Sequence, residues 1–147
     1  MYSILMDENK YLKATKTQML YQGENYVDNI YFIIPQLYDG IDISSWTCAL
    51  TIKYPNNLID IEILEPDDIP YKENYTRYIY KSKSSNLTKY VGTVTLGLKL
   101  EHVDQEQLIQ YSLTTSTIDV EISPISTIYN FSDDSLNKFD EIIGKLD

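Results

Sequence analysis

The chain has 147 residues, 43% of them hydrophobic, a length and composition typical of one folded domain. Its 22 acidic residues outnumber the 12 basic ones and give a formal net charge of -10. Because phosphate groups and anionic lipids attract basic surfaces, this charge argues against binding to nucleic acid or to a membrane surface. The single cysteine excludes an intrachain disulfide framework and a thiolate metal cluster.

The first residues do not resemble an export signal. Acidic Asp7 and Glu8 stand where a signal peptide needs a basic start and a long apolar run. No window contains the roughly 18 apolar residues of a membrane-spanning helix. We therefore expect synthesis in a cytoplasm without a recognisable export signal.

Alternation of apolar and polar residues predicts half-buried β-strands along most of the chain. Residues 14–21 form the first candidate. Residues 26–34 form the second, with a dense apolar run that Pro35 ends. Residues 46–54 then alternate cleanly from Trp46 onward. The later candidate strands are residues 59–63, 75–81, 93–100, 110–114 and 117–122. Turn signals separate them at residues 22–25, 39–40, 55–57, 66–68 and 82–86.

About seven to nine short strands, each with one apolar face, predict an all-β fold. A second sheet is the simplest cover for those faces, so we expect a sandwich of two antiparallel sheets over residues 1–124. A small barrel is the alternative. The residues expected in the core are Trp46, Leu50, Ile52, Ile61, Leu96, Leu98, Ile118 and Val120.

The last twenty-odd residues change character after Pro124. Residues 125–132 are interpreted as a connector, and residues 133–147 as a short amphipathic helix with acids at its start. Apolar side chains recur there at three- and four-residue steps, at Leu136, Phe139, Ile143 and Leu146. This stripe either begins an oligomeric stem or packs on the β-domain of the same chain, and the pattern leaves both open.

The sequence offers little for catalysis. His102 is the only histidine, with no second histidine at metal-ligand spacing, and we expect it to be an ordinary strand-end residue. Cys48 lies mid-strand beside core positions and is expected to be a buried core residue. The carboxylates near residues 65–68, 104–106 and 133–134 are interpreted as solvated turns. We therefore predict no catalytic residue, no metal ligand and no cofactor.

Fourteen tyrosines make this residue unusually frequent. Tyrosine has an apolar ring and a polar tip, which suit sugar stacking and protein contacts. The cluster Tyr71, Tyr75, Tyr78 and Tyr80 is the candidate aromatic binding surface. Cross-strand aromatic packing is the simpler interpretation of the same cluster.

The order of the segments resembles the N-terminal domain of phage baseplate upper proteins and related tail-fibre attachment domains. The residues that carry this resemblance are Asp42–Trp46, Tyr75–Tyr80, Ser85–Gly92, Thr93–Leu100 and Ser116–Ser123, followed by the helical segment. The resemblance implies an immunoglobulin-like sandwich that anchors a fibre or receptor-binding protein to a tail, and trimers or higher assemblies through the stem. It supplies no catalytic residues.

These observations favour a non-enzymatic structural protein of a phage or prophage tail baseplate. We expect it in the virion, bound to other baseplate or tail proteins and self-associated through the stem. A carbohydrate-binding module or adhesin that uses surface tyrosines is the first rival. An enzyme on a β-scaffold is the second, and the scarcity of histidine and of glycine motifs counts against it.

Overall fold

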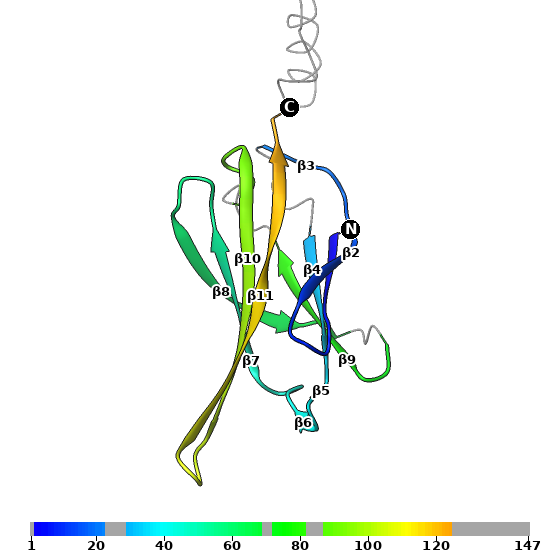
Figure 1. Cartoon of the computed structure of the whole chain (residues 1–147), viewed down its shortest axis with the longest axis vertical. Coiled ribbons are helices and arrows are strands. Elements are labelled where there is room, and N and C mark those ends of the chain that lie inside the picture. The colour runs from blue at the N-terminus through cyan, green and yellow to red at the C-terminus, as the bar shows by residue number, and fades with distance from the viewer. Residues whose placement is uncertain (1, 23–28, 69–71, 82–86, 125–147) are drawn as a thin grey trace, which may run out of the picture.

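The computed structural model describes residues 2–22, 29–68, 72–81 and 87–124, and this part of the chain contains strands and turns but no helix (Figure 1). Nine strands share one sheet, and two more form a separate short ribbon. The strands are β1 (Tyr2–Met6), β2 (Leu12–Lys16), β3 (Leu20–Tyr21), β4 (Asn29–Pro35), β5 (Leu37–Tyr38), β6 (Ile41–Asp42), β7 (Thr47–Lys53), β8 (Ile59–Pro66), β9 (Tyr75–Lys81), β10 (Gly92–Asp104) and β11 (Ile109–Ser123). The described residues are therefore all-β, as the sequence predicts.

The large sheet is mixed and has the order β2-β1-β4-β9-β8-β7-β10-β11-β3. Neighbours run antiparallel except for β1 with β4 and β11 with β3, which are parallel. Strand β8 joins two halves, because it pairs with β7 from Ile59 to Leu64 and with β9 only at Glu65 and Pro66. One strand thus continues through the corner, and the two halves form one strongly curled sheet.

The curl wraps this sheet around one core. Ile4 and Phe32 from one half join Leu50 and Leu96 from the other in a single cluster of buried side chains. Burial of this apolar area is the main contribution to the stability of such a fold. The concave side of the sheet is therefore the interior of the domain.

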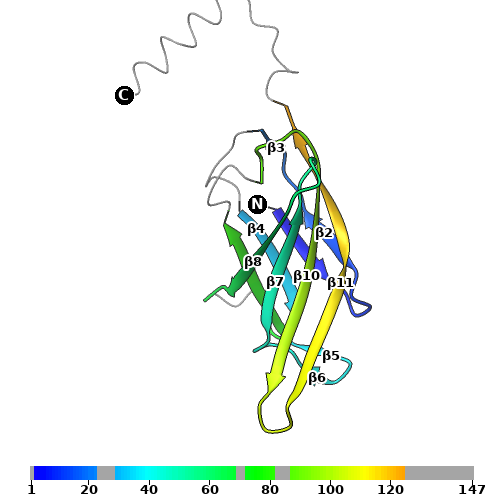
Figure 2. The ribbon, with the colours of Figure 1, turned by 90° about the vertical axis from the view of Figure 1, so that its left-hand side faces the viewer.

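Ser116 links the two sides of the curl opposite β8. The Leu12 N–H donates a hydrogen bond to Ser116 Oγ at 3.0 Å, and the Ser116 N–H donates to the Lys10 carbonyl at 2.8 Å. These bonds hold β2 beside β11 and give the sheet a half-barrel form (Figure 2). The structure does not show the expected immunoglobulin-like sandwich of two separate sheets and is nearer to the barrel alternative. Alternation predicts which residues face inward, but it does not predict how a sheet closes.

The predicted core is largely confirmed, with one reversal. Among the described residues, Leu50, Ile52, Leu96, Leu98 and Val120 are at most 2% exposed, and Trp46 and Ile118 pack partly buried against them. Ile61 was expected among them and is 68% exposed. The alternation of β8 is real, but Ile59, Ile61 and Ile63 point away from the core, while Leu64 of the same strand is buried. The prediction for Ile61 is therefore wrong.

The strand predictions differ from the structure mainly in their bounds. Residues 110–114 and 117–122 belong to one long strand, β11, with an irregularity in its pairing near Gly97 of β10. Strand β1 was not predicted. The predicted helix of residues 133–147 lies outside the described residues, as does the connector before it. Within the part of the chain that the structure describes, no helix is long and apolar enough to cross a membrane.

Candidate functional site at the hairpin end

The β10–β11 hairpin extends beyond the rest of the sheet (Figures 1 and 2). The pairing of β7 with β10 ends where Thr47 meets Glu101, whereas β10 and β11 continue to pair as far as Asp104 and Ile109. A two-stranded ribbon therefore projects with no third strand beside it among the described residues. Side chains on both of its faces are accessible to a partner.

The turn of this hairpin holds a leucine in an unfavourable backbone conformation. Asp104 Oδ1 accepts hydrogen bonds from the N–H groups of Glu106 at 3.0 Å and Gln107 at 3.2 Å, which fixes the turn. Leu108 follows with a φ of 54° and a side chain that is 87% exposed. This left-handed region costs an ordinary L-residue about 1–2 kcal/mol. A strained and exposed leucine contributes nothing to the core, which makes it a candidate contact residue.

Three aromatic rings form a compact cluster at the base of the ribbon, and we call this cluster the ring row because its residues occupy adjacent positions beside the start of β7 and on β10 and β11. The Trp46 and His102 rings are stacked, with centroids 6.0 Å apart and planes within 12°. The Tyr111 ring lies 6.0 Å from Trp46 and 6.4 Å from His102. The strand register brings these residues together. His102 pairs with Tyr111, and Trp46 comes one position before the Thr47–Glu101 pair, which puts it beside His102. The three side chains therefore occupy neighbouring positions on consecutive strands.

The ring row is the place where the core opens to solvent. Two residues further into the sheet, the same face carries buried Cys48, Leu100 and Leu113. At the row itself, Trp46 is half-buried, and Tyr111 is already 37% exposed. Apolar surface thus runs continuously from the interior to the ribbon.

The short β5–β6 ribbon borders the row. Asp39 and Gly40 both have positive φ angles, 47° and 80°, as a two-residue type I′ hairpin turn requires. This turn was predicted from the Asp-Gly pair. A cavity of about 270 Å³ lies between this ribbon and the large hairpin, lined among others by Tyr38, Ile41 and Trp46. The two ribbons therefore form one surface.

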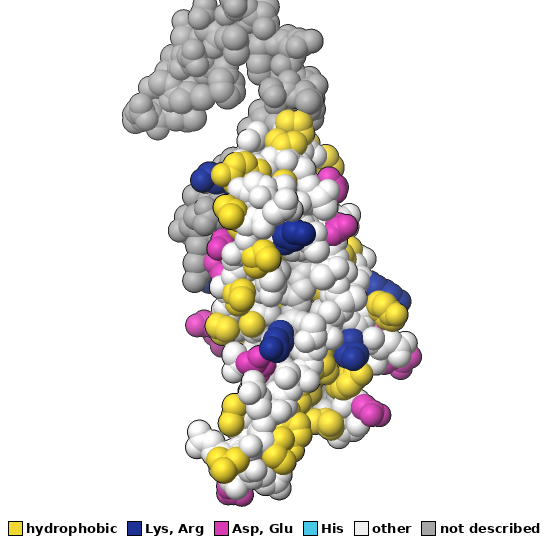
Figure 3. Space-filling view, turned by 60° about the vertical axis from the view of Figure 1, so that its left-hand side comes forward, with side chains coloured by type: hydrophobic (Ala, Val, Ile, Leu, Met, Phe, Trp, Pro, Cys, Tyr) yellow, Lys and Arg dark blue, Asp and Glu magenta, His cyan; other side chains and the backbone are white. Residues whose placement is uncertain are grey.

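Exposed apolar side chains gather at this end of the molecule, and Figure 3 shows hydrophobic side chains at its lower tip. We call the following set the hairpin end: Leu37, Ile41, Val103, Leu108, Ile109 and Tyr111. Each of these is between 37% and 87% exposed. Exposed apolar side chains gathered in this way mark sites of protein contact more often than sites of chemistry.

Two tyrosines of the predicted aromatic surface lie in the core. Tyr78 and Tyr80 are 2% and 3% exposed, and Tyr75 is half-buried. Burial raises the pKa of both Tyr78 and Tyr80 to about 12. Their rings therefore pack inside the sheet and offer no open face to a sugar. Tyr71 lies outside the described residues, as do the stem residues Leu136, Phe139, Ile143 and Leu146.

The residues considered for catalysis are buried in the core, paired in an ion pair or bonded within a turn. Cys48 is 0% exposed, and burial raises the pKa of its thiol to about 12, so it is a core residue. Arg77 Nε donates a hydrogen bond to Asp67 Oδ2 at 2.7 Å, and the two form an ion pair with little exposure. Asp104 holds the hairpin turn. Among the described residues, no three His, Cys, Asp or Glu side chains gather as metal ligands would.

The hairpin end does not follow from the apolar–polar alternation of the sequence. The sequence feature that could have indicated it is a polar turn flanked by Val103 on one side and Leu108–Ile109 on the other. The turn joins two strands that are longer than their neighbours. His102, expected to be an ordinary strand-end residue, stands in the ring row. Only the register of β7, β10 and β11 brings Trp46 to the same place.

The described residues thus form an all-β module with exposed apolar side chains gathered at one end. No protein-family model matches the chain, and no curated protein is similar to it in sequence. Among solved structures, the chain is similar to the N-terminal domain of phage TP901-1 ORF48, with a TM-score of 0.46 and 10% sequence identity. The similarity covers 83% of this chain and 95% of that chain.

Proposed function

We propose that this chain is a non-enzymatic attachment module of a phage or prophage tail baseplate, and that it docks through the hairpin end. The main support for this proposal is that the hairpin end and the exit of β11 from the sheet lie at opposite tips of the molecule. The hairpin end lies at one tip of the molecule, and β11 leaves the sheet at Ser123 at the other tip (Figures 1 and 2). A module built in this way can be held at one tip and carry a further segment from the other.

The strain at Leu108 supports a contact role for the hairpin end. A hairpin under selection for stability alone would place glycine or asparagine at a φ of 54°. A leucine there costs folding free energy and exposes an apolar side chain, which a partner can bury. The ring row beneath it adds flat aromatic surface of the kind that protein interfaces favour.

The partners proposed are other tail or baseplate proteins at the hairpin end. A second set of contacts is proposed through the stem, where Leu136, Phe139, Ile143 and Leu146 of several copies would associate, with a trimer favoured. In this role the protein resides in the virion after synthesis in the host cytoplasm. It needs no cofactor, because attachment involves no chemical step.

The test uses particles of the phage or prophage whose genome encodes the chain. Antibody labelling in electron micrographs should place the protein at the tail. The double variant Val103→Thr with Leu108→Asn should fold normally and be missing from particles. Met19→Gln removes an exposed apolar side chain far from the hairpin end and should be incorporated like the wild type.

Two results would oppose the proposal. Normal incorporation of the hairpin-end variant would show that this surface is not the attachment site. Absence of the wild-type protein from particles, together with binding of purified protein to a glycan array, would favour the carbohydrate-binding rival.

A further inference from the structure

Strand β8 carries a second exposed apolar surface, remote from the hairpin end. Ile59, Ile61 and Ile63 are 59%, 68% and 63% exposed. They stand on the convex face of the sheet, because the residues between them pair with buried residues of β7. Figure 3 brings forward the side of the molecule on which Figure 1 labels β8. Isoleucine side chains that stay in water forgo the favourable transfer of apolar surface away from solvent.

The opposite face of the same stretch is acidic. Asp60 and Glu62 pair with Ile52 and Leu50 of β7, which are fully buried, so both carboxylates lie on the concave side. The Tyr54 hydroxyl donates a hydrogen bond to Asp60 Oδ2 at 2.7 Å. Burial and then these acids raise the pKa of Tyr54. Strand β8 thus presents apolar side chains on one face and carboxylates on the other.

One backbone edge of this stretch points away from β7. The Tyr54 N–H donates to the Leu58 carbonyl at 2.9 Å, which places the even-numbered residues in the bonded positions of the β7–β8 ladder. The odd-numbered residues must then direct their N–H and C=O groups to the other side. Just after the strand, the Asp67 N–H confirms this direction, because it donates to the Arg77 carbonyl of β9 at 2.6 Å.

That edge has no neighbouring strand along Ile59 to Ile63 in the part of the chain that the structure describes. Strand β9 pairs with β8 only at Glu65 and Pro66, so a notch opens between the two strands. Natural sheets protect such edges with lysine, proline or a covering segment, because an open apolar edge templates the addition of another strand. Strand β8 has isoleucines at these positions and therefore lacks such protection.

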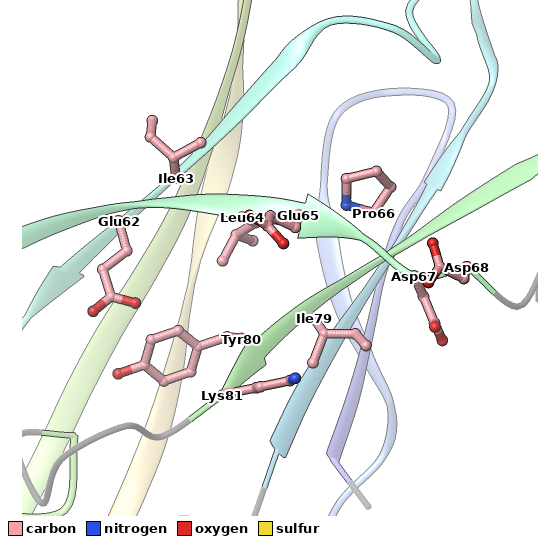
Figure 4. Close-up of a pocket in the computed structure, with 10 residues that line it drawn as sticks. All are labelled: Glu62, Ile63, Leu64, Glu65, Pro66, Asp67, Asp68, Ile79, Tyr80 and Lys81. Atoms are coloured by element: carbon pink, nitrogen blue, oxygen red, sulfur yellow. The ribbon is translucent and has the colours of Figure 1, made fainter.

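The notch is acidic. Its cavity measures about 330 Å³, and its lining includes Glu62, Glu65 and Asp68 against a single cation, Lys81, among the described residues. Figure 4 shows Glu62 on the Tyr80 side of β8 and Ile63 on the opposite side. A strand added at this edge would therefore meet carboxylates with every second side chain and isoleucines with the others.

We propose that the open edge of β8 accepts an extended segment of another protein as an added strand, and that this segment alternates aliphatic residues with lysine or arginine. Strand side chains have a period of two, so the aliphatic ones would cover the isoleucines and the basic ones would face Asp60, Glu62 and the notch. The proposal concerns a different surface from the hairpin end and does not depend on it.

A second copy of the chain fits this edge less well. Antiparallel self-pairing centred on Ile61 would place Asp60 of one copy directly opposite Glu62 of the other, and the reverse pair beside it. Like charges in directly opposed positions destabilise a strand pair. A basic partner strand would instead place positive charges opposite Asp60 and Glu62. We therefore favour a basic strand of another protein over a second copy of the chain.

The test is amide hydrogen exchange on the full chain, read residue by residue by NMR. The probe is a synthetic peptide of alternating valine and lysine, as long as the 8 residues of β8. In the free protein, the amides of Ile59, Ile61 and Ile63 should exchange freely. Saturating peptide should slow them at least about tenfold. The amides of Asp60, Glu62 and Leu64 bond to β7 and should be protected in both states, which provides an internal control.

Variants distinguish peptide binding through the backbone edge of β8 from peptide binding through charge attraction alone. Ile61→Pro removes an N–H from the open edge without touching the β7 ladder and should weaken peptide binding at least about tenfold. If that variant does not fold, Ile61→Lys replaces it, with the same expectation. Leu108→Asn at the hairpin end should bind the peptide normally, and a valine–glutamate peptide should not bind the wild type.

Each other outcome overturns the proposal. Protection of the three edge amides in the free protein at every concentration would show that the chain itself already covers the edge. Protection that grows with protein concentration alone would assign the edge to a second copy. An unchanged exchange pattern with peptide, or equal binding of both peptides, would show that no basic strand adds there.

Discussion

A comparison of alanine variants at Ile52 and Ile61 tests which face of β8 is turned towards the core. Both residues belong to clean alternating segments, and the pattern predicts both in the core. The structure separates them, because Ile52 on β7 is 0% exposed and Ile61 on neighbouring β8 is 68% exposed. Replacement by alanine removes the same atoms at each position, so any difference between the two variants reports the environment alone.

The expected costs differ severalfold. Ile52→Ala should lower the free energy of unfolding by about 2–5 kcal/mol, because it removes buried contacts and leaves a cavity. Ile61→Ala should cost less than about 1 kcal/mol, because the side chain is mostly in water and only strand propensity changes. In a domain of this size each kcal/mol corresponds to about 2–4 °C in the midpoint of thermal unfolding.

Urea denaturation, followed by the fluorescence of the single tryptophan, Trp46, measures both values. The two variants should have equal slopes of free energy against urea and clearly separated midpoints. An Ile61→Ala variant as destabilised as Ile52→Ala would show that the convex face of β8 is covered in the folded protein. A covered β8 would also lack the open edge at which a strand can be added.

Four further predictions concern other parts of the chain. Leu108→Asn should leave stability unchanged or raise it by up to about 1 kcal/mol, since asparagine tolerates the positive φ; urea denaturation checks this. Ser116→Ala leaves the Leu12 N–H without its acceptor and should cost about 1–3 kcal/mol in the same assay. The pKa of Cys48 is raised from 9.0 to about 12 in the folded state, so the unfolded chain binds fewer protons between those values. Stability from this group should be constant below pH 9 and fall as pH rises towards 12, in pH-dependent urea titrations. The double variant Phe139→Asp with Ile143→Asp should dissociate an oligomer in sedimentation while the melting of the β-domain stays the same; a monomeric wild type, with loss of stability in the variant, would contradict the stem.

Local sequence signals predicted much of the fold. The alternating segments 46–54 and 93–100 became β7 and β10, and their apolar residues form the core as expected. The Asp39–Gly40 pair marked its turn because few residue pairs adopt two positive φ angles. Each of these features depends on residues close together in the chain, which is why the sequence alone reveals them.

The features that the sequence did not predict depend on distant neighbours. Alternation in 59–63 identified two faces but could not say which one the rest of the protein covers. The inner face of β8 tolerates Asp60 because the Tyr54 hydroxyl bonds to it, and Glu62 because β9 diverges and leaves water access. The hairpin end was missed for a similar reason, since exposure of Val103 follows from where β7 stops.

The two exposed apolar surfaces differ in what a partner must supply. The hairpin end offers side chains on a projecting ribbon, so a partner must provide a complementary pocket. The β8 edge offers unpaired backbone groups, so a partner must provide a strand of matching alternation. Different partners can therefore occupy the two surfaces, because β7 lies between β8 and the β10–β11 hairpin in the sheet. Saturation of β8 with the valine–lysine peptide should then leave docking through the hairpin end unchanged, and competition between the two would mean that one partner spans both surfaces.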